Sequence, residues 1–202
     1  MSHMTSLEMP IADEDADRAV LYGFLGRMLQ AEPTAKDLAT IGQIQSDETA
    51  VGRALGHLAE AARNTNTAEL RRSYQDLFIG VGRGELVPYG SYYLTGFLHE
   101  KPLADLRASM AELGIERAEG VSEPEDHIAA LMQMMEGLIL GSFGAPLPLE
   151  GQKDFFKTHI GSWAPHFFKD LAANKTCPFY AAVGEAGQVF MDVEEDAFGM
   201  TK

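Results

Sequence analysis

Acidic and histidine side chains gather in one short stretch, SEPEDHIAALMQMMEGL, at residues 122–138. Glu123, Glu125, Asp126 and His127 stand there within five positions. A carboxylate can hold a guanidinium group through two parallel hydrogen bonds, and a histidine can orient it or contact a peptide backbone. Asp126 is therefore a candidate partner for an arginine side chain, with His127 beside it.

Local helix chemistry accounts for part of this acidity. Ser122 with Glu125 three residues later has the pattern of a capping box, and Pro124 suits the first turn of a helix. Acidic side chains at a helix start also gain about 0.3–1 kcal/mol each from the helix dipole. These features predict a helix from residue 123 to about 142.

The same predicted helix separates core residues from surface residues. With a turn of about 100° per residue, five apolar side chains fall on one stripe. His127 borders this stripe and Asp126 points nearly opposite to it, so neither is predicted to fill the core. A histidine at the edge of an apolar face is more often a structural hydrogen-bonding residue than a ligand. The stripe consists of Ile128, Leu131, Met132, Met135 and Ile139.

The histidines give little support for a metal site. Glu123 and His127 are four positions apart but lack a nearby third ligand, and the sequence contains no HExxH. His159 and His166 would share a helix face only if one helix passed through Pro165. Metal binding is therefore a minor alternative.

The stretch GVGRGELVPYGS at residues 80–91 breaks the helical pattern with four glycines and a proline. Its glycines do not match GxxxxGK[ST], and they do not follow a strand as GxGxxG should. A nucleotide hydrolase that uses this loop is an alternative that the pattern disfavours.

Cys177 is the only cysteine, which excludes an intrachain disulfide. It precedes a predicted helix start, where a thiolate is favoured. A lone thiol is nevertheless more often structural.

Helical periodicity runs through most of the chain, with no convincing alternating strand. The fold class is therefore all-α: a single-domain bundle of about eight to ten helices over residues 5–202, with a Gly/Pro-rich loop near 80–92. Residues 1–4, MSHM, resemble the remnant of an expression tag. The first helix should place Val20, Phe24 and Met28 on its apolar face. The predicted helices span about 13–31, 34–45, 47–63, 66–78, 91–99, 103–113 and 123–142, then two segments from Asp154 to Leu171 on either side of Pro165, and 178–196.

Composition narrows the class of partner. The 202 residues carry a formal net charge of −14, which offers no positive field to hold the phosphates of a nucleic acid. A basic peptide suits such a surface better. No apolar run approaches the roughly 20 residues that span a bilayer, and the N-terminus lacks a signal-peptide pattern, so a cytoplasmic protein is expected.

Three segments, in this order, resemble the TorD/DmsD family of cytoplasmic redox-enzyme maturation chaperones, which is related to NarJ. They are YQDLFIGVGRGELVPYGSYYL (74–94), EPEDH (123–127) and FKTHIGSWAPHFFKDL (156–171), and the resemblance extends from about residue 16 to 190. The elements that carry it are Tyr74, Leu77 and Phe78; Gly82, Gly84, Pro88, Gly90, Ser91 and Tyr93; and Glu123, Pro124, Asp126 and His127.

The resemblance implies a chaperone, not an enzyme. Such a protein binds the twin-arginine signal peptide and the apo-form of a molybdopterin oxidoreductase, assists cofactor insertion and delays export until folding is complete. It needs no cofactor of its own, although the family includes members with weak GTP binding. Monomers and domain-swapped dimers are both compatible with it.

The resemblance also implies that the Asp-His element and the neighbouring loop recognise the signal peptide. From the residues themselves, we assign Asp126 to pair with a guanidinium group and His127 to orient it. The methionines at 132, 134 and 135 offer an apolar edge beside them, although a methionine stripe at helical spacing is more often core, and the loop tyrosines either line the same groove or pack the loop onto the bundle. Two other readings stay open: a chaperone for a non-exported respiratory molybdoenzyme subunit and, less well supported, a guanine-nucleotide-binding protein. The implied site consists of Glu123, Asp126, His127, Tyr74, Leu77, Phe78, Pro88, Tyr89, Gly90, Ser91 and Tyr93.

Overall fold

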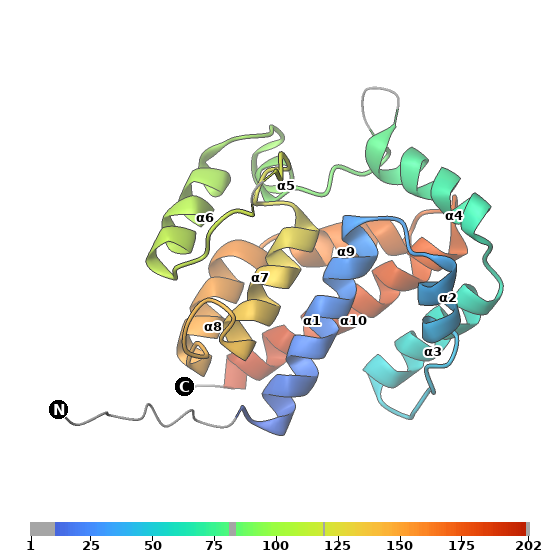
Figure 1. Cartoon of the computed structure of the whole chain (residues 1–202), viewed down its shortest axis with the longest axis horizontal. Coiled ribbons are helices and arrows are strands. Elements are labelled where there is room, and N and C mark those ends of the chain that lie inside the picture. The colour runs from blue at the N-terminus through green and yellow to red at the C-terminus, as the bar shows by residue number, and fades with distance from the viewer. Residues whose placement is uncertain (1–10, 81–83, 119, 201–202) are drawn as a thin grey trace.

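A computed structural model describes residues 11–80, 84–118 and 120–200. The described part contains ten α-helices, two short π-helical segments and no named strand, which confirms the all-α class (Figure 1). The expected tag remnant at residues 1–4, and Gly82 of the Gly/Pro loop, lie outside the described residues. The α-helices are α1 (Asp13–Gln30), α2 (Ala35–Ile41), α3 (Ala50–Arg63), α4 (Thr67–Tyr74), α5 (Gly90–Thr95), α6 (Lys101–Glu112), α7 (Ile128–Leu140), α8 (Leu149–Phe155), α9 (Ala164–Ala172) and α10 (Pro178–Met200).

The core is built around α1, α7 and α10. Helix α1 packs along α7, and α10 packs against both α9 and α3 (Figure 1). Helices α5 and α6 lie at one end of the bundle and α2 to α4 at the other. The π-helical segments continue two helices: η1 (Gln75–Ile79) follows α4, and η2 (Phe156–Ile160) follows α8. The two ends of the bundle therefore present separate surfaces.

Several element boundaries follow from local chemistry. The side chain of Asn66 accepts a hydrogen bond from the Glu69 backbone N–H at 2.9 Å and begins α4. Thr34 and Asp37 form a reciprocal capping box at the start of α2. Gly96 ends α5 at a φ of +84°, a left-handed conformation that favours glycine.

The helix predicted from residue 123 begins instead at Ile128. Its N-cap is His127, whose Nδ1 accepts a hydrogen bond from the Ala129 N–H at 3.1 Å, so the Ser122–Glu125 capping box is wrong. Residues 124–127 form one turn, in which the His127 N–H donates to the Pro124 carbonyl at 3.2 Å, and Asp126 is buried instead of pointing to solvent. The apolar stripe on α7 is confirmed, because all five of its residues are buried.

Two smaller predictions also fail. The helix expected to start at Asp154 begins five residues earlier, as α8 from Leu149, after Pro148. Val20 is exposed, because Ala19 and Tyr22 are the neighbouring residues that face the core of α1. Wide apolar faces leave the exact direction of a helix ambiguous until its neighbours are known.

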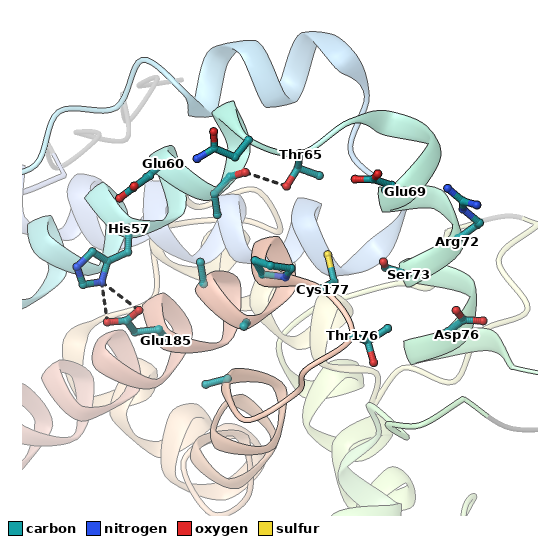
Figure 2. A pocket seen from close by; sticks show the side chains of 16 residues that line it. His57, Glu60, Thr65, Glu69, Arg72, Ser73, Asp76, Thr176, Cys177 and Glu185 are labelled. Carbon is teal, nitrogen blue, oxygen red and sulfur yellow. Dashed lines mark hydrogen bonds and ion pairs between the residues drawn. The ribbon is translucent and has the colours of Figure 1, made fainter.

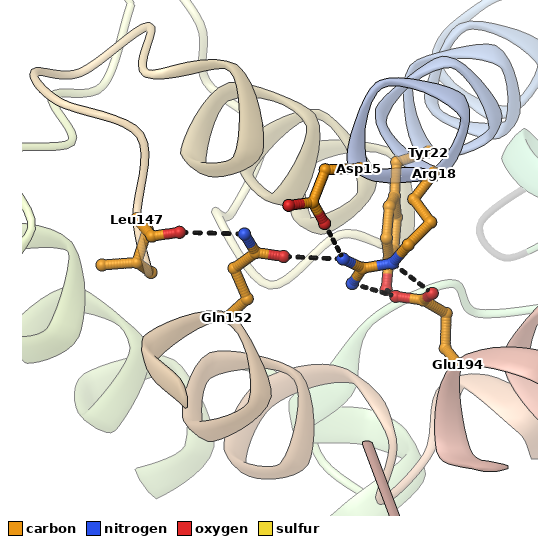
Figure 3. A network of polar contacts seen from close by, with 6 residues as sticks. All are labelled: Asp15, Arg18, Tyr22, Leu147, Gln152 and Glu194. Atoms are coloured by element: carbon orange, nitrogen blue, oxygen red, sulfur yellow. Dashed lines mark hydrogen bonds and ion pairs between the residues drawn. The ribbon is translucent and has the colours of Figure 1, made fainter. Parts of the chain in front are cut away.

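A buried polar network joins the N-terminal and C-terminal helices (Figure 3). The Arg18 guanidinium in α1 donates two hydrogen bonds of 2.7 Å to the Glu194 carboxylate in α10, which is fully buried. Tyr22 donates a 2.6 Å bond to the same carboxylate. Arg18 also donates to Asp15 at 2.6 Å and to Gln152 of α8 at 2.8 Å, so one guanidinium connects three helices.

One buried polar atom lacks any such partner. The hydroxyl of Tyr180 is buried without a hydrogen bond within the described structure, in an aromatic cluster with Tyr74, Phe78 and Phe179. Burial raises its pKa. A buried unsatisfied hydroxyl costs about 1–3 kcal/mol relative to a satisfied one.

We therefore expect Tyr180→Phe to raise the free energy of unfolding by about 1 kcal/mol, because it removes this hydroxyl and keeps the ring. Urea unfolding followed by circular dichroism measures the change. Tyr22→Phe is the matched control, since it removes a hydroxyl that does have a partner and should lower stability. A loss of stability in Tyr180→Phe would contradict the prediction.

Candidate functional site

The Gly/Pro-rich loop and the acid–histidine stretch lie against each other. The Gly90 N–H donates to the Asp126 carbonyl at 2.9 Å, and the Ile128 N–H donates to the Pro88 carbonyl at 2.8 Å. Between them Tyr89 and His127 form an isolated antiparallel bridge. Two segments that are 35 residues apart therefore meet at the junction of α5 and α7.

Asp126 ties the two segments together. Its Oδ2 accepts a 2.7 Å hydrogen bond from the Ser91 N–H and a second bond from the Ser91 hydroxyl. Ser91 lies in the first turn of α5, so the carboxylate caps that helix from another part of the chain. Both described bonds use Oδ2, which leaves Oδ1 open to a further partner in the described structure.

His127 is held as a neutral imidazole. Burial lowers its pKa to about 4. Its Nδ1 accepts from the Ala129 N–H, and the edge of its ring meets the Tyr89 ring with 5.1 Å between centroids. At neutral pH the imidazole therefore adds no positive charge beside the Asp126 carboxylate.

The other two acids of the stretch have different surroundings. The buried Glu125 carboxylate accepts bonds of 3.0 and 2.8 Å from Arg107 of α6, and Arg117 lies 3.6 Å away. Burial opposes the charge, but these hydrogen bonds lower the Glu125 pKa below its usual range. Glu123 is exposed, and its carbonyl accepts from Arg117 at 2.8 Å. Glu125 is therefore occupied by arginines of this chain.

Asp126 faces a small cavity of about 110 Å³ between α5, α6, α7 and η2. Asp105 of α6 supplies a second carboxylate, and the buried Trp163 supplies an aromatic wall. Gly90 lies against that wall: a Cβ there would stand only 3.0 Å from Trp163 Nε1. His159 also lines the cavity, with its Nε2 2.9 Å from the Ser109 hydroxyl, and burial lowers its pKa.

An exposed apolar patch begins at the edge of this cavity. Leu94 lines the cavity and is 44% exposed, while Phe97 and Leu98 in the following turn are 70% and 42% exposed. Large apolar side chains that gather at a cavity mouth are typical of a surface that binds a partner. We call Leu94, Phe97 and Leu98 the apolar patch.

Some of the implied site residues lie elsewhere. Leu77 is fully buried, and Tyr74 and Phe78 pack on Tyr180 of α10 instead of lining the Asp126 cavity. Tyr93 packs on Trp163, its hydroxyl donates to Asp170 at 3.0 Å, and it does not line the cavity. The methionines at 132, 134 and 135 are buried, so the expected methionine-lined groove is wrong.

The site also contains residues that sequence reasoning missed. Asp105 has no local signal, because an acid four residues after Lys101 reads as an ordinary helix ion pair, which it also forms. Phe97 and Leu98 gave a weak signal, as consecutive large apolar residues directly after a glycine. No group of three metal-ligating side chains occurs among residues 11–80, 84–118 and 120–200, and His166 is exposed while His159 is buried.

Comparison with known proteins places this geometry in a family. The model of the family described as nitrate reductase delta subunit matches residues 44–169. A chaperone protein TorD of Vibrio cholerae is 26% identical over 208 residues, covering 93% of this chain and 94% of the relative. A chaperone protein TorD of Aliivibrio fischeri is 28% identical over 194 residues, covering 82% and 87%.

The fold has a solved counterpart. A crystal structure from Archaeoglobus fulgidus, assigned to a redox enzyme maturation protein, matches with a TM-score of 0.57 and 20% identity. The match covers 93% of this chain and 98% of that one, so the two proteins share their overall fold. No helix in the described part of this chain is both long and apolar enough to cross a membrane.

The family model covers more than half of the chain. The chain belongs to the nitrate reductase delta subunit family, the NarJ/TorD family, whose members are redox-enzyme maturation chaperones and not enzymes.

Proposed function

We propose that this protein is a cytoplasmic chaperone that binds the twin-arginine signal peptide and the apo-form of a molybdopterin oxidoreductase. It assists cofactor insertion and delays export until the client has folded. Similarity over nearly the whole length of proteins named chaperone protein TorD supports this function. Signal-peptide recognition rests on the site itself.

The observation that carries the proposal is the position of two carboxylates beside an apolar patch. A twin-arginine signal peptide presents guanidinium groups followed by an apolar stretch, so its receptor needs acidic side chains next to apolar ones. Asp105 and Asp126 line the cavity, and Leu94 connects it to Phe97 and Leu98. One arginine would enter the cavity while the apolar stretch lies on the patch.

The size of the cavity limits what can enter it. Pockets for small-molecule ligands usually measure about 300–1,000 Å³, well above this cavity's volume of about 110 Å³. A single planar guanidinium group fits such a space, and the Trp163 side chain that lines it adds an aromatic contact of the kind that arginine side chains favour. A guanine nucleotide is too large for it and would bring phosphates toward two carboxylates.

The test is a calorimetric titration with the signal peptide of a molybdoenzyme encoded beside the gene for this chain. We expect Asp105→Asn to weaken binding about tenfold, because it removes one charge-assisted partner of the guanidinium. Asp126→Asn should weaken binding by at least as much; the amide oxygen can still accept from Ser91, so the cap on α5 is kept. Replacing the two arginines of the peptide by lysine should also weaken binding, because lysine lacks the planar fork.

Asp192→Asn is the matched control, because it removes an exposed carboxylate of α10 that does not line the cavity. All variants are checked for folding by their unfolding midpoints. Equal affinity of the wild type, Asp105→Asn and Asp126→Asn would refute the assigned site. Binding that requires the client body and ignores the signal peptide would indicate instead a chaperone for a non-exported molybdoenzyme subunit.

A further inference from the structure

A much larger groove, of about 1080 Å³, lies at the other end of the bundle (Figure 2). It is bounded by α3, α4 and the first turns of α10, and none of its lining residues lines the Asp126 cavity. Of the residues that carry the family resemblance in this region, Tyr74 lies in α4 and Leu77 and Phe78 lie in η1, and none of the three lines the groove. The groove is therefore a surface that the proposed signal-peptide site leaves unused.

The floor of the groove is made of small side chains. Ala61 comes from α3, Ala172 from the end of α9, and Ala181 and Ala182 from α10. Pro178 begins α10 at the same floor. Small side chains allow the backbone of a partner segment to come close, and their methyl groups offer an apolar contact.

The rim of the groove is acidic. Glu60, Glu69 and Asp76 are exposed, and no side-chain partner for them occurs in the described structure. Glu185 is paired with His57, with 3.0 Å between its Oε1 and the imidazole Nδ1 (Figure 2). Arg72 is the single arginine or lysine among the lining residues. Four carboxylates against one guanidinium give the groove a negative potential, which favours a basic partner and repels phosphates.

A serine hydroxyl also opens onto the groove. Ser73 of α4 is 9% exposed and lines the groove, and its hydroxyl makes no hydrogen bond among the described residues. Figure 2 shows this hydroxyl directed from α4 toward the side of α10 where Cys177 lies. Because this hydroxyl is open to the groove, it can donate a hydrogen bond to, or accept one from, the backbone of a bound polypeptide.

We propose that this groove is a docking site for a basic segment in the mature body of the client enzyme. Small or apolar side chains of the segment would lie on the alanine floor, and its lysines or arginines would meet Glu60, Glu69 and Asp76. The inference rests on the proposed chaperone function for the identity of the partner. The shape, the charge and the free Ser73 hydroxyl support the groove independently of the Asp126 site.

Two separate surfaces would let one chaperone hold a client at two points. When the signal peptide occupies the Asp126 cavity, the groove meets the client body at a high effective concentration. The overall affinity for a client with its signal peptide then exceeds the affinity of either part alone, provided that both can bind at once. Release of the body on folding would leave the signal peptide as the remaining contact.

The experiment uses the apo-molybdoenzyme encoded beside the gene for this chain, with its signal peptide deleted, as the probe. Calorimetry compares wild type with the double variant Glu60→Gln, Glu69→Gln, and separately with Ala181→Trp, whose ring would fill the floor. We expect the double variant to bind the probe about tenfold more weakly, and Ala181→Trp to lose binding by more than that. Higher salt should reduce the difference between wild type and the double variant, because it screens rim charges.

The matched control is Glu48→Gln with Glu112→Gln, which removes two exposed carboxylates outside the groove. The probe should bind this control as it binds wild type. The proposal that the groove docks the client body would be refuted by either of two results. One is equal binding of the probe to wild type and to the double variant, and the other is no binding of the probe to wild type. If Ala181→Trp does not fold, the double variant at the exposed rim decides alone.

A parallel titration with the isolated signal peptide separates this inference from the proposed function. The groove variants should bind the peptide as tightly as wild type does. Suppose that the isolated peptide binds neither wild type nor any variant, while binding of the probe still depends on Glu60 and Glu69. That result would refute signal-peptide recognition and support the groove as the docking site for the client body. A peptide that loses affinity in the groove variants would show that the groove is the signal-peptide site and overturn the assignment to the client body.

Discussion

Replacement of Glu194 by alanine is expected to lower the free energy of unfolding by about 3–5 kcal/mol. Glu194 is fully buried in α10, and its carboxylate accepts two 2.7 Å bonds from Arg18 and one 2.6 Å bond from Tyr22. Its removal would leave the mostly buried Arg18 guanidinium without its main counter-charge. A single unpaired buried charge is among the largest destabilising changes that one substitution can make.

The size of the effect depends on the unpaired charge and not on the loss of the pair itself. Burying two charges costs desolvation energy that their attraction only about repays, so an apolar pair of similar volume is often as stable. The double variant Arg18→Met, Glu194→Leu should therefore recover most of the stability that Glu194→Ala loses. Arg18 also lies 4.9 Å from the Phe198 ring centroid, a contact that a methionine can partly replace.

Chemical unfolding monitored by circular dichroism gives the two values. Asp15→Ala is the matched control, because Asp15 is another carboxylate bonded to Arg18 but is about one third exposed, and its loss should cost less than about 1 kcal/mol. A double variant as unstable as Glu194→Ala would show that the network is needed for packing geometry and not for charge balance. A cost below about 1 kcal/mol for Glu194→Ala would contradict the prediction.

Helix positions in this protein follow from local sequence wherever a single cap and a clear apolar period coincide. Asn66 begins α4 as expected, since its cap involves neighbouring residues only, whereas the helix predicted over 91–99 ends early, at Gly96. The start of α7 shows the limit of that reasoning. Ser122 and His127 both offer an N-cap. The choice depends on Ser91 and Pro88, which bond to Asp126 and Ile128 from another part of the chain and keep residues 126–127 outside the helix.

The composition of the candidate site shows the same limit. The resemblance predicted that Asp126 and the Gly/Pro loop act together, and residues 88–91 do bond to residues 126–128. Periodicity placed Asp126 on the solvent side, whereas it is 3% exposed and faces a cavity. Asp105 and Trp163 come to that cavity from α6 and from the turn before α9, a proximity set by helix packing that no local pattern encodes.

The Arg18–Glu194 pair lay outside any sequence argument for a related reason. Its members are 176 residues apart and meet because α1 packs against α10. An arginine among acids at a helix start reads as a surface residue, and a glutamate near the acidic C-terminal end of the chain reads as a solvated one. Only the packed bundle shows that both are buried and bonded.

Acidification should destabilise the protein through His127. Burial lowers its folded-state pKa to about 4, compared with about 6.5 when the chain is unfolded. Below about pH 6.5 His127 binds a proton in the unfolded chain but not in the folded chain. The free energy of unfolding is therefore unaffected by His127 above that pH and falls as the pH drops toward 4. At pH 5 the loss from this one residue is about 2 kcal/mol relative to pH 7.5.

The structure gives this loss a specific cause that a variant can remove. The lone pair of His127 Nδ1 accepts the hydrogen bond that begins α7, and a protonated imidazole has no lone pair to accept it. His127→Asn keeps an N-cap acceptor but cannot titrate. Between pH 7.5 and pH 5 the free energy of unfolding should therefore fall by about 2 kcal/mol more in wild type than in His127→Asn. The control is His57→Asn, which changes an exposed histidine and should lose as much stability as wild type does. Equal losses in wild type and His127→Asn would mean that the imidazole is not held neutral, and the Asp126 carboxylate would then face a positive charge at the mouth of the site proposed to bind arginine.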